Sequence, residues 1–226
     1  MKHVGEFWLP DVDLRWWSNW GKTRRKTLER YGTGAGPKAA DMEAALASVP
    51  KGGLALDGGA NVGAYTRIMA QHFDRVIAFE PAPDTFACLE RNVRDWGLGE
   101  RVEVRPVALS DRREQVGLKG RRGHRSLSRR VSGPGTIQSL PIDALELPAL
   151  AFLKLDLEGY EVRALRGALV TLARCRPYVL FEDKPHKSEL YGEAREAHDI
   201  LLSLGAGLIA RIGKHGNDWL YGFPAE

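Results

Sequence analysis

The chain has 226 residues, of which 43% are hydrophobic and 27% are charged, a composition typical of one large globular domain. Two cysteines are too few for a disulfide framework or a thiolate metal cluster, and no apolar stretch reaches the length of a signal peptide or a membrane span. The histidines do not stand at metal-ligand spacing. We therefore expect a cytoplasmic protein with no membrane association and no structural metal.

The positive charge of the chain is concentrated in one segment. Residues 112–130 contain eight of the 33 Lys and Arg residues and one of the 29 acidic residues, so the rest of the chain is slightly acidic. Such a run is typical of a solvated loop, which is the interpretation we favour. The alternatives are a lid that recognises an anionic acceptor and a nucleic-acid contact. The lack of interleaved aromatic residues argues against nucleic acid.

Residues 1–50 are expected to form an N-terminal extension that precedes the main domain, residues 51–226. Residues 38–49 have the apolar spacing of a helix. The segment before them contains a basic run at 22–26 and four of the six tryptophans, Trp8, Trp16, Trp17 and Trp20. We expect this aromatic segment to cover the domain, where it would cap a cofactor or join a homodimer. A stacking patch for nucleic acid is the alternative.

From residue 54 onward, short apolar strands alternate with amphipathic helices, as a parallel sheet with right-handed crossovers requires. The expected strands are 54–57, 76–80, 102–109, 152–156 and 178–182. The expected helices are 62–73, 83–96, 160–173 and 193–204. Residues 110–140 are expected to be irregular, with a short strand near 116–118. The chain end, 207–212 and 219–223, predicts a hairpin, so the fold class is a doubly wound α/β sheet, mostly parallel, with a C-terminal antiparallel hairpin.

A glycine-rich turn joins the first strand to its helix. The strand ends in Asp57, the chain turns through Gly58 and Gly59, and Gly63 lets the helix pack closely on the strand. This geometry brings the backbone close to a ligand at a helix N-terminus. Asp57 would repel the pyrophosphate of a dinucleotide, but it suits S-adenosylmethionine (SAM), whose methionyl end carries an ammonium and a sulfonium. The turn therefore favours SAM over NAD.

Two further strand ends would complete an adenosine site. Glu80 ends the second strand about twenty residues after the first glycines, where an acid reaches both hydroxyls of a ribose. At the end of the third strand, Ala108 and Leu109 would flank an adenine ring, with Asp111 near its exocyclic amine. An ordinary Asp turn is the alternative for this last segment.

Three acids surround the expected carboxyl end of the fourth strand, where ligands bind in such sheets. They are Asp156, Glu158 and Glu161, and their possible roles are to hold the ammonium of the cofactor, to act as a general base or to bind a metal. His186, after the fifth strand, is a second candidate general base, since histidine titrates near neutral pH. A solvated loop histidine is the alternative.

These motifs together resemble the FkbM-type methyltransferases, which are SAM-dependent O-methyltransferases that act on sugars and other secondary metabolites. The most specific part is Lys154–Glu161, with the pattern Lys-x-Asp-x-Glu-Gly-x-Glu. The other matching segments are Asp57–Gly63, Phe79–Pro81 with Asn92, Ala108–Asp111, Ser126–Leu127, Leu165–Ala168 and Arg176–Glu182. Residues 1–50 and 183–226 match no pattern of the family.

The resemblance implies a class I, Rossmann-like methyltransferase fold with SAM as its cofactor. The candidate SAM-binding residues are Asp57, Gly58, Gly59, Asn61, Gly63, Glu80, Pro81, Ala108, Leu109, Asp111 and Asp156. The candidate catalytic residues are Asp156, Glu158 and His186. The expected reaction transfers a methyl group to a hydroxyl of a small-molecule or saccharide acceptor. The alternatives are an NAD- or nucleotide-binding oxidoreductase and a nucleic-acid methyltransferase that uses residues 112–130.

Overall fold

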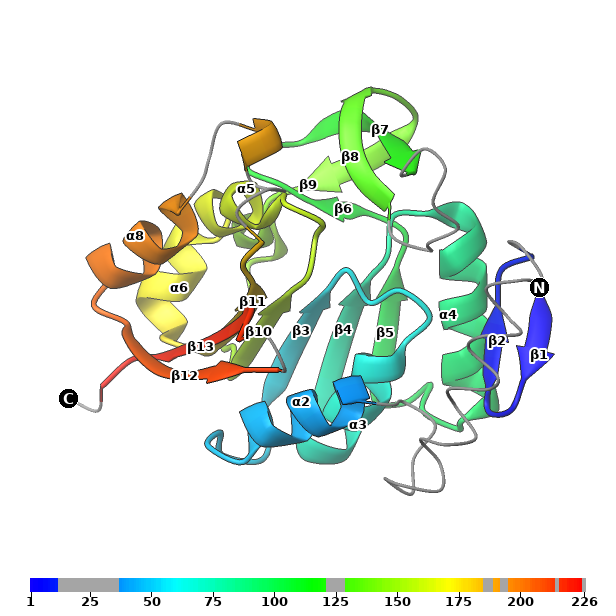
Figure 1. The fold of residues 1–226 in the computed structure, drawn as a ribbon, viewed down its shortest axis with the longest axis horizontal. Coiled ribbons are helices and arrows are strands. Elements are labelled where there is room, and N and C mark those ends of the chain that lie inside the picture. Colours follow the sequence, from blue (N-terminus) through cyan, green and yellow to red (C-terminus); the bar gives the residue numbers. More distant parts are fainter. Residues whose placement is uncertain (12–36, 121–128, 185–188, 192–194, 214–215, 225–226) are drawn as a thin grey trace.

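The computed structural model describes residues 1–11, 37–120, 129–184, 189–191, 195–213 and 216–224. At its centre is a seven-stranded sheet with the order β12-β13-β11-β10-β3-β4-β5 (Figure 1). The strands are β3 (Leu54–Gly58), β4 (Arg75–Phe79), β5 (Val102–Arg105), β10 (Phe152–Leu155), β11 (Tyr178–Glu182), β12 (Gly207–Ile212) and β13 (Asp218–Gly222). The five strands from β11 to β5 are parallel, and β13 is antiparallel to β11 and to β12. The predicted parallel sheet and its closing hairpin are therefore confirmed.

The direction of strand succession reverses between β3 and β10. From β3 the sheet grows outward through β4 to β5, and from β10 it grows the opposite way through β11. In open α/β sheets, the crevice outside the carboxyl ends of the strands at such a reversal is the usual ligand site. The topology thus singles out the ends of β3 and β10, where Asp57 stands opposite Lys154 in the parallel register.

Helices cover both faces of the sheet (Figure 1). On one face lie α2 (Pro37–Leu46), α3 (Ala64–His72) and α4 (Pro83–Asp95); on the other lie α5 (Glu161–Arg166), α6 (Leu169–Cys175) and α8 (Glu196–Ser203). Neighbouring strand residues point to opposite faces. Accordingly, Ala55 and Val76 belong to the core beneath α2, α3 and α4, whereas Leu56 and Ile77 belong to the core beneath α5, α6 and α8.

The expectation for residues 102–140 is confirmed only in part: β5 begins at Val102 and β7 includes the short strand expected near 116–118, but the rest of the segment is not irregular. The third strand ends at Arg105, and a second, four-stranded sheet follows with the order β6-β9-β7-β8. Its strands are β6 (Ala108–Leu109), β7 (Glu114–Gly120), β8 (Arg129–Pro134) and β9 (Ile137–Leu140), followed by the 3-10 helix η1 (Ile142–Leu145). Pro106 has no N–H to continue a ladder. In β7 and β8 only Val116 and Val131 are buried, so the alternation that reveals a half-buried strand is nearly absent.

The expected helix at 160–173 is in fact two helices, α5 and α6, separated at Gly167 and Ala168. A β-carbon on Gly167 would lie 2.0 Å from the backbone oxygen of Ser110. Any residue with a β-carbon would collide with this oxygen, so only glycine lets the chain lie this close to Ser110, at the end of β6. This contact fixes the first turns after β10 against the end of β6.

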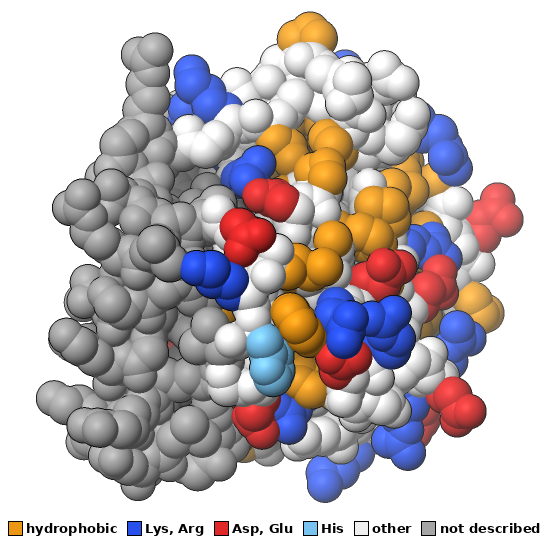
Figure 2. Space-filling view, turned by 90° about the vertical axis from the view of Figure 1, so that its right-hand side faces the viewer, with side chains coloured by type: hydrophobic (Ala, Val, Ile, Leu, Met, Phe, Trp, Pro, Cys, Tyr) orange, Lys and Arg blue, Asp and Glu red, His pale blue; other side chains and the backbone are white. Residues whose placement is uncertain are grey.

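The N-terminus forms a small hairpin, β1 (Lys2–Val4) and β2 (Phe7–Leu9), that packs on α4. The buried Asn92 side chain donates to the backbone oxygens of Trp8 (2.9 Å) and Val62 (2.8 Å) and accepts from the Trp8 N–H at 2.6 Å. Figure 2 looks onto this side of the molecule, where hydrophobic side chains form a band beside Lys and Arg side chains. The hydrogen bonds of Asn92 thus join the hairpin to the chain segment that enters α3.

Trp16, Trp17, Trp20 and the basic run at 22–26 lie outside the described residues. The helix expected at 38–49 is α2, and its Met42 and Leu46 are buried in the core shared with α3. Within the part of the chain that the structure describes, none of the helices has the length and apolar character needed to cross a membrane.

Candidate functional site

The glycine-rich turn after β3 is pressed between the ends of two neighbouring strands. The N–H groups of Gly59 and Ala60 both donate to the backbone oxygen of Phe79, at 3.0 and 2.9 Å. On the other side, a β-carbon on Gly59 would lie 2.1 Å from the backbone oxygen of Asp156, and its φ of +73° is in the left-handed region. Only glycine fits this position. The contacts at the ends of β4 and β10 therefore fix the backbone conformation of the turn.

A buried ion pair lies beneath the turn. Lys154 Nζ lies 2.8 Å from Asp57 Oδ1 and donates to the backbone oxygens of Gly58 (3.1 Å) and Gly59 (2.9 Å). The second oxygen of Asp57 accepts from the Thr66 hydroxyl at 2.7 Å. Lys154 was not expected to be a site residue, although it belongs to the Lys-x-Asp motif, because its partner depends on strand register.

Glu80 follows β4 and faces the same turn. Its Oε2 accepts from the Asn61 N–H and its Oε1 from the Ala82 N–H, both at 2.9 Å. Burial raises the pKa of Glu80 to about 7, although these two hydrogen bonds oppose the shift. A carboxylate oxygen can accept more than one hydrogen bond. Glu80 is thus oriented by the protein while retaining acceptor capacity for a ligand.

Only part of the segment expected to flank an adenine ring, Ala108–Asp111, lies beside the turn. Leu109 is buried, and its Cδ1 lies 2.9 Å from the position that a β-carbon on Gly58 would take. Asp111 lies farther along and accepts from Arg112 Nε at 3.1 Å. Burial alone would raise the pKa of Asp111, but hydrogen bonds and positive charge from Arg112 hold it below its usual value. Ala108 is buried in the core of the second sheet.

The three acids after β10 occupy different environments. Asp156 is half-buried and lines a pocket. Glu158 is also half-buried, has a φ of +58° and is not among the residues that line this pocket. Glu161 is turned inward, accepts from the Leu157 N–H at 2.6 Å, and has its pKa raised to about 8 by burial. Glu161 therefore shapes the loop that carries Asp156.

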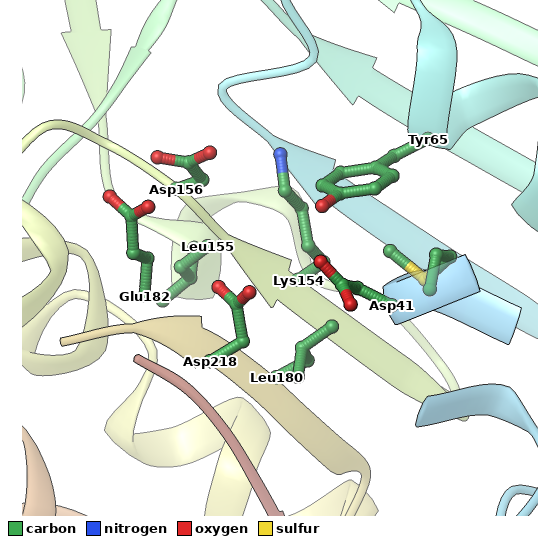
Figure 3. Close-up of a pocket in the computed structure, with 9 residues that line it drawn as sticks. Asp41, Tyr65, Lys154, Leu155, Asp156, Leu180, Glu182 and Asp218 are labelled. Atoms are coloured by element: carbon green, nitrogen blue, oxygen red, sulfur yellow. The ribbon is translucent and has the colours of Figure 1, made fainter. Parts of the chain in front are cut away.

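The pocket opens beside the ends of β10 and β11. Figure 3 shows Asp156 and Glu182 on one side, Lys154 and Tyr65 on the other, and Asp218 between them. The lining residues are Asp41, Met42, Tyr65, Lys154, Leu155, Asp156, Leu180, Glu182 and Asp218. Four carboxylates from four separate elements thus surround one opening. Among the described residues, no group of three or more His, Cys, Asp or Glu side chains is arranged to hold a metal ion.

Sequence reasoning did not identify Asp41, Tyr65, Glu182 or Asp218 as site residues. Glu182 and Asp218 are paired in the register of β11 and β13, and Asp41 comes from α2. Burial, followed by the nearby carboxylates, raises the pKa of Tyr65, so its phenol is protonated at neutral pH. The one available signal was that Glu182 ends a strand at the ligand edge of the sheet.

The remaining predicted residues are distributed as follows. Asp57, Gly58, Gly59 and Asn61 lie in or under the turn, and Pro81 follows Glu80 as a half-buried residue. Gly63 lies behind the turn, where a β-carbon would meet Leu89 and Trp96 at 2.8 and 3.2 Å. His186 and residues 121–128, which include Ser126 and Leu127, lie outside the described residues.

Comparison with known proteins gives a family and a fold. A model of the methyltransferase FkbM domain matches residues 57–207. The crystal structure of methyltransferase FkbM from Methylobacillus flagellatus KT is 22% identical with a TM-score of 0.50; the match covers 75% of this chain and 43% of that protein. This chain thus spans less than half of the length of that methyltransferase. No curated protein matches the chain in sequence.

Two other solved structures are similar over most of their own length. Precorrin 8w decarboxylase from Methanobacterium thermoautotrophicum is 16% identical with a TM-score of 0.51, covering 83% of this chain and 90% of that protein. A methyltransferase from Geobacter sulfurreducens is 15% identical with a TM-score of 0.50, covering 96% and 91%. At such identities the likeness concerns the fold alone. The predicted class I, Rossmann-like methyltransferase fold is confirmed.

Proposed function

The chain belongs to the FkbM methyltransferase family, and we propose that it transfers the methyl group of SAM to a hydroxyl oxygen of a small-molecule or saccharide acceptor. The observation that carries this proposal is the position of the Glu80 carboxylate. It is buried, faces the glycine turn and is oriented by two backbone N–H groups. A carboxylate held in this way suits the two hydroxyls of an adenosine ribose.

Charge complementarity supports SAM over NAD as the cofactor. With its ribose at Glu80 and its adenine toward Leu109, the methionyl end of SAM would extend along the turn toward the pocket at Asp156. Carboxylates there favour a ligand that carries an ammonium and a sulfonium. The same carboxylates oppose the pyrophosphate of NAD. An NAD-dependent oxidoreductase is therefore the weaker candidate.

SAM supplies an electrophilic methyl group, which an acceptor oxygen attacks in line with the departing sulfur. The protein must hold the two reactants collinear and accept the hydroxyl proton. Asp156 lines the pocket from the end of β10 and is half-buried, so its carboxylate is our candidate base. Tyr65 keeps its proton at neutral pH, so it is not a candidate base. His186, after β11 in the chain, is the rival base.

The charge of the pocket also limits the acceptor. Asp41, Asp156 and Asp218 disfavour an anionic group next to the reacting hydroxyl, whereas the charge of Glu182 is offset by its ion pair with Lys184. An anionic acceptor would place its charge toward β7 and β8, which carry Lys119, Arg129 and Arg130. We therefore propose an acceptor whose reacting end is uncharged, with any phosphate or carboxylate at a distance from it.

The test is methyl transfer from SAM labelled in its methyl group to a panel of hydroxylated acceptors. The panel pairs each neutral sugar with its phosphorylated or carboxylated counterpart and with its amino sugar. The proposal predicts labelled methyl ethers, which are identified by mass spectrometry and survive alkali. Label found only on amine nitrogen, or only in alkali-labile esters, would contradict methyl transfer to a hydroxyl.

A further inference from the structure

We propose that Lys154 is a positioning residue that fixes the cofactor-binding turn, and that Asp57 is its counter-ion rather than a direct ligand of the cofactor ammonium. This inference rests on the proposed function, because it concerns how the chain holds SAM. The side chain of Lys154 is 3% exposed and lies beneath a turn that is itself expected to contact the ligand.

The hydrogen bonds of Lys154 all go to the turn and its strand. An ammonium group has three hydrogens. The Nζ atom has three acceptors in range: Asp57 Oδ1 at 2.8 Å, Gly59 O at 2.9 Å and Gly58 O at 3.1 Å. The ammonium therefore has no hydrogen left for a ligand, and its effect on a cofactor must pass through the backbone that it holds.

Both carboxylate oxygens of Asp57 also have partners within the protein. Its side chain has no exposed surface, one oxygen faces Lys154, and the other accepts from the Thr66 hydroxyl at 2.7 Å. A ligand ammonium would have to displace one of these partners to reach the carboxylate. The pair is also neutral as a unit, so its attraction for a distant cation is weak.

The position of Lys154 explains how several negatively charged oxygens can lie close together at the turn. The backbone oxygens of Gly58 and Gly59 and the carboxylate of Asp57 converge on its Nζ atom, and all carry partial or full negative charge. The Lys154 ammonium is the cation among them. Gly58 O also accepts from the Asp156 N–H at 3.1 Å. One side chain thus sets the turn relative to the loop that carries Asp156.

The experiment compares cofactor affinity in folded variants by calorimetry with SAM and with S-adenosylhomocysteine. Lys154→Met with Asp57→Asn removes both charges and every hydrogen bond of Lys154 to the turn. Asp57→Asn alone keeps an oxygen toward Lys154 and leaves both bonds to the glycine oxygens. Lys51→Met, on the exposed residue before β3, is the control for loss of a lysine. Circular dichroism and thermal melting establish that each variant is folded.

The proposal predicts that the double variant binds both ligands at least about tenfold more weakly than Asp57→Asn alone, because the turn loses its anchor. The loss should be similar for SAM and S-adenosylhomocysteine, since both contact the turn. Equal affinities in the double variant and in Asp57→Asn would overturn the positioning role, whether both are weak or both are normal. A merely structural lysine would lower the melting temperature and leave affinity unchanged.

A second variant covers the case in which the double variant does not fold. Lys154→Arg keeps the charge beside Asp57, but its planar guanidinium cannot reproduce the three-way contact of an ammonium. This variant should also bind SAM and S-adenosylhomocysteine about tenfold or more weakly than the wild-type protein does. Wild-type affinity in a folded Lys154→Arg protein would contradict the proposal. If the wild-type protein itself does not bind SAM, the proposed function fails, which is a different result from equal affinities among the variants.

Discussion

The Glu80 carboxylate accepts a hydrogen bond from the backbone N–H of Asn61 at 2.9 Å, which joins the end of β4 to the turn that follows β3. Asn61 has a φ of +54°, so the backbone turns sharply where it meets the acid. The ribose-binding candidate and the glycine turn are thus one unit, and a change in either is expected to affect the other.

Replacement of Glu80 by alanine should weaken SAM binding by about 1.5 to 3 kcal/mol, the range for charge-assisted hydrogen bonds. Glu80→Gln is the matched variant, because it keeps the size and one acceptor oxygen and should lose less. Calorimetry with SAM measures both. Unchanged affinity in Glu80→Ala would remove Glu80 from the cofactor site.

SAM affinity should depend on pH through Glu80. The pKa of Glu80 is raised to about 7 by burial, and the ionised carboxylate is the form that accepts from two hydroxyls. Affinity should therefore fall as the pH is lowered through 7 and level off above it. Titrations of the wild-type protein and of Glu80→Gln between about pH 6 and about pH 8, roughly one unit either side of the Glu80 pKa, measure this. An equally steep fall in Glu80→Gln would assign the effect to another group.

Glu161 should make the free energy of unfolding pH-dependent. Its pKa rises from 4.5 to about 8 on folding, so the native state binds more protons than the unfolded state between these values. The contribution of this carboxyl is complete below its unfolded pKa and is lost as the pH rises toward 8. The slope is at most about 1.4 kcal/mol per pH unit.

Glu161→Gln keeps the side-chain oxygen near the Leu157 N–H and cannot ionise, so its stability should vary less over this interval. Urea denaturation at a series of pH values compares the two proteins. Parallel curves for the wild-type protein and Glu161→Gln would show that Glu161 does not titrate as its burial predicts.

Asp156→Asn tests the proposed base. If Asp156 accepts the hydroxyl proton, turnover at saturating SAM and acceptor should fall by about 10²- to 10⁴-fold. If it only holds the cofactor or the acceptor, the loss should appear mainly in affinity. Glu158→Gln is the matched control, and His186→Ala tests the rival base. Wild-type turnover in Asp156→Asn would show that Asp156 is not the base. The proton acceptor would then be His186 or solvent.

Local motifs were sufficient to place part of the candidate site at the ligand edge of the sheet. Asp57, Gly59 and Glu80 stand at strand ends followed by turn residues, so each could be placed at the ligand edge from its own segment. The roles of Lys154 and Asp218 could not be predicted in this way, because each depends on the residue opposite it in a neighbouring strand. Asp41 reaches the pocket from a helix whose sequence has no site pattern.

The second sheet was missed for a different reason. Its longest strands, β7 and β8, bury one residue each, Val116 and Val131, and carry charged and glycine residues elsewhere. Such strands are stabilised by pairing with each other and with β9 rather than by an apolar face. Hydrophobic periodicity detects burial, so it does not detect strands of this kind.

The measurement that tests the central claim most directly is calorimetric titration of the wild-type protein with SAM, S-adenosylhomocysteine and NAD under one set of conditions. The account predicts saturable binding of SAM and S-adenosylhomocysteine with one site per chain, and no heat of binding from NAD. Saturable binding of NAD together with no binding of SAM would contradict the proposed methyl-transfer function.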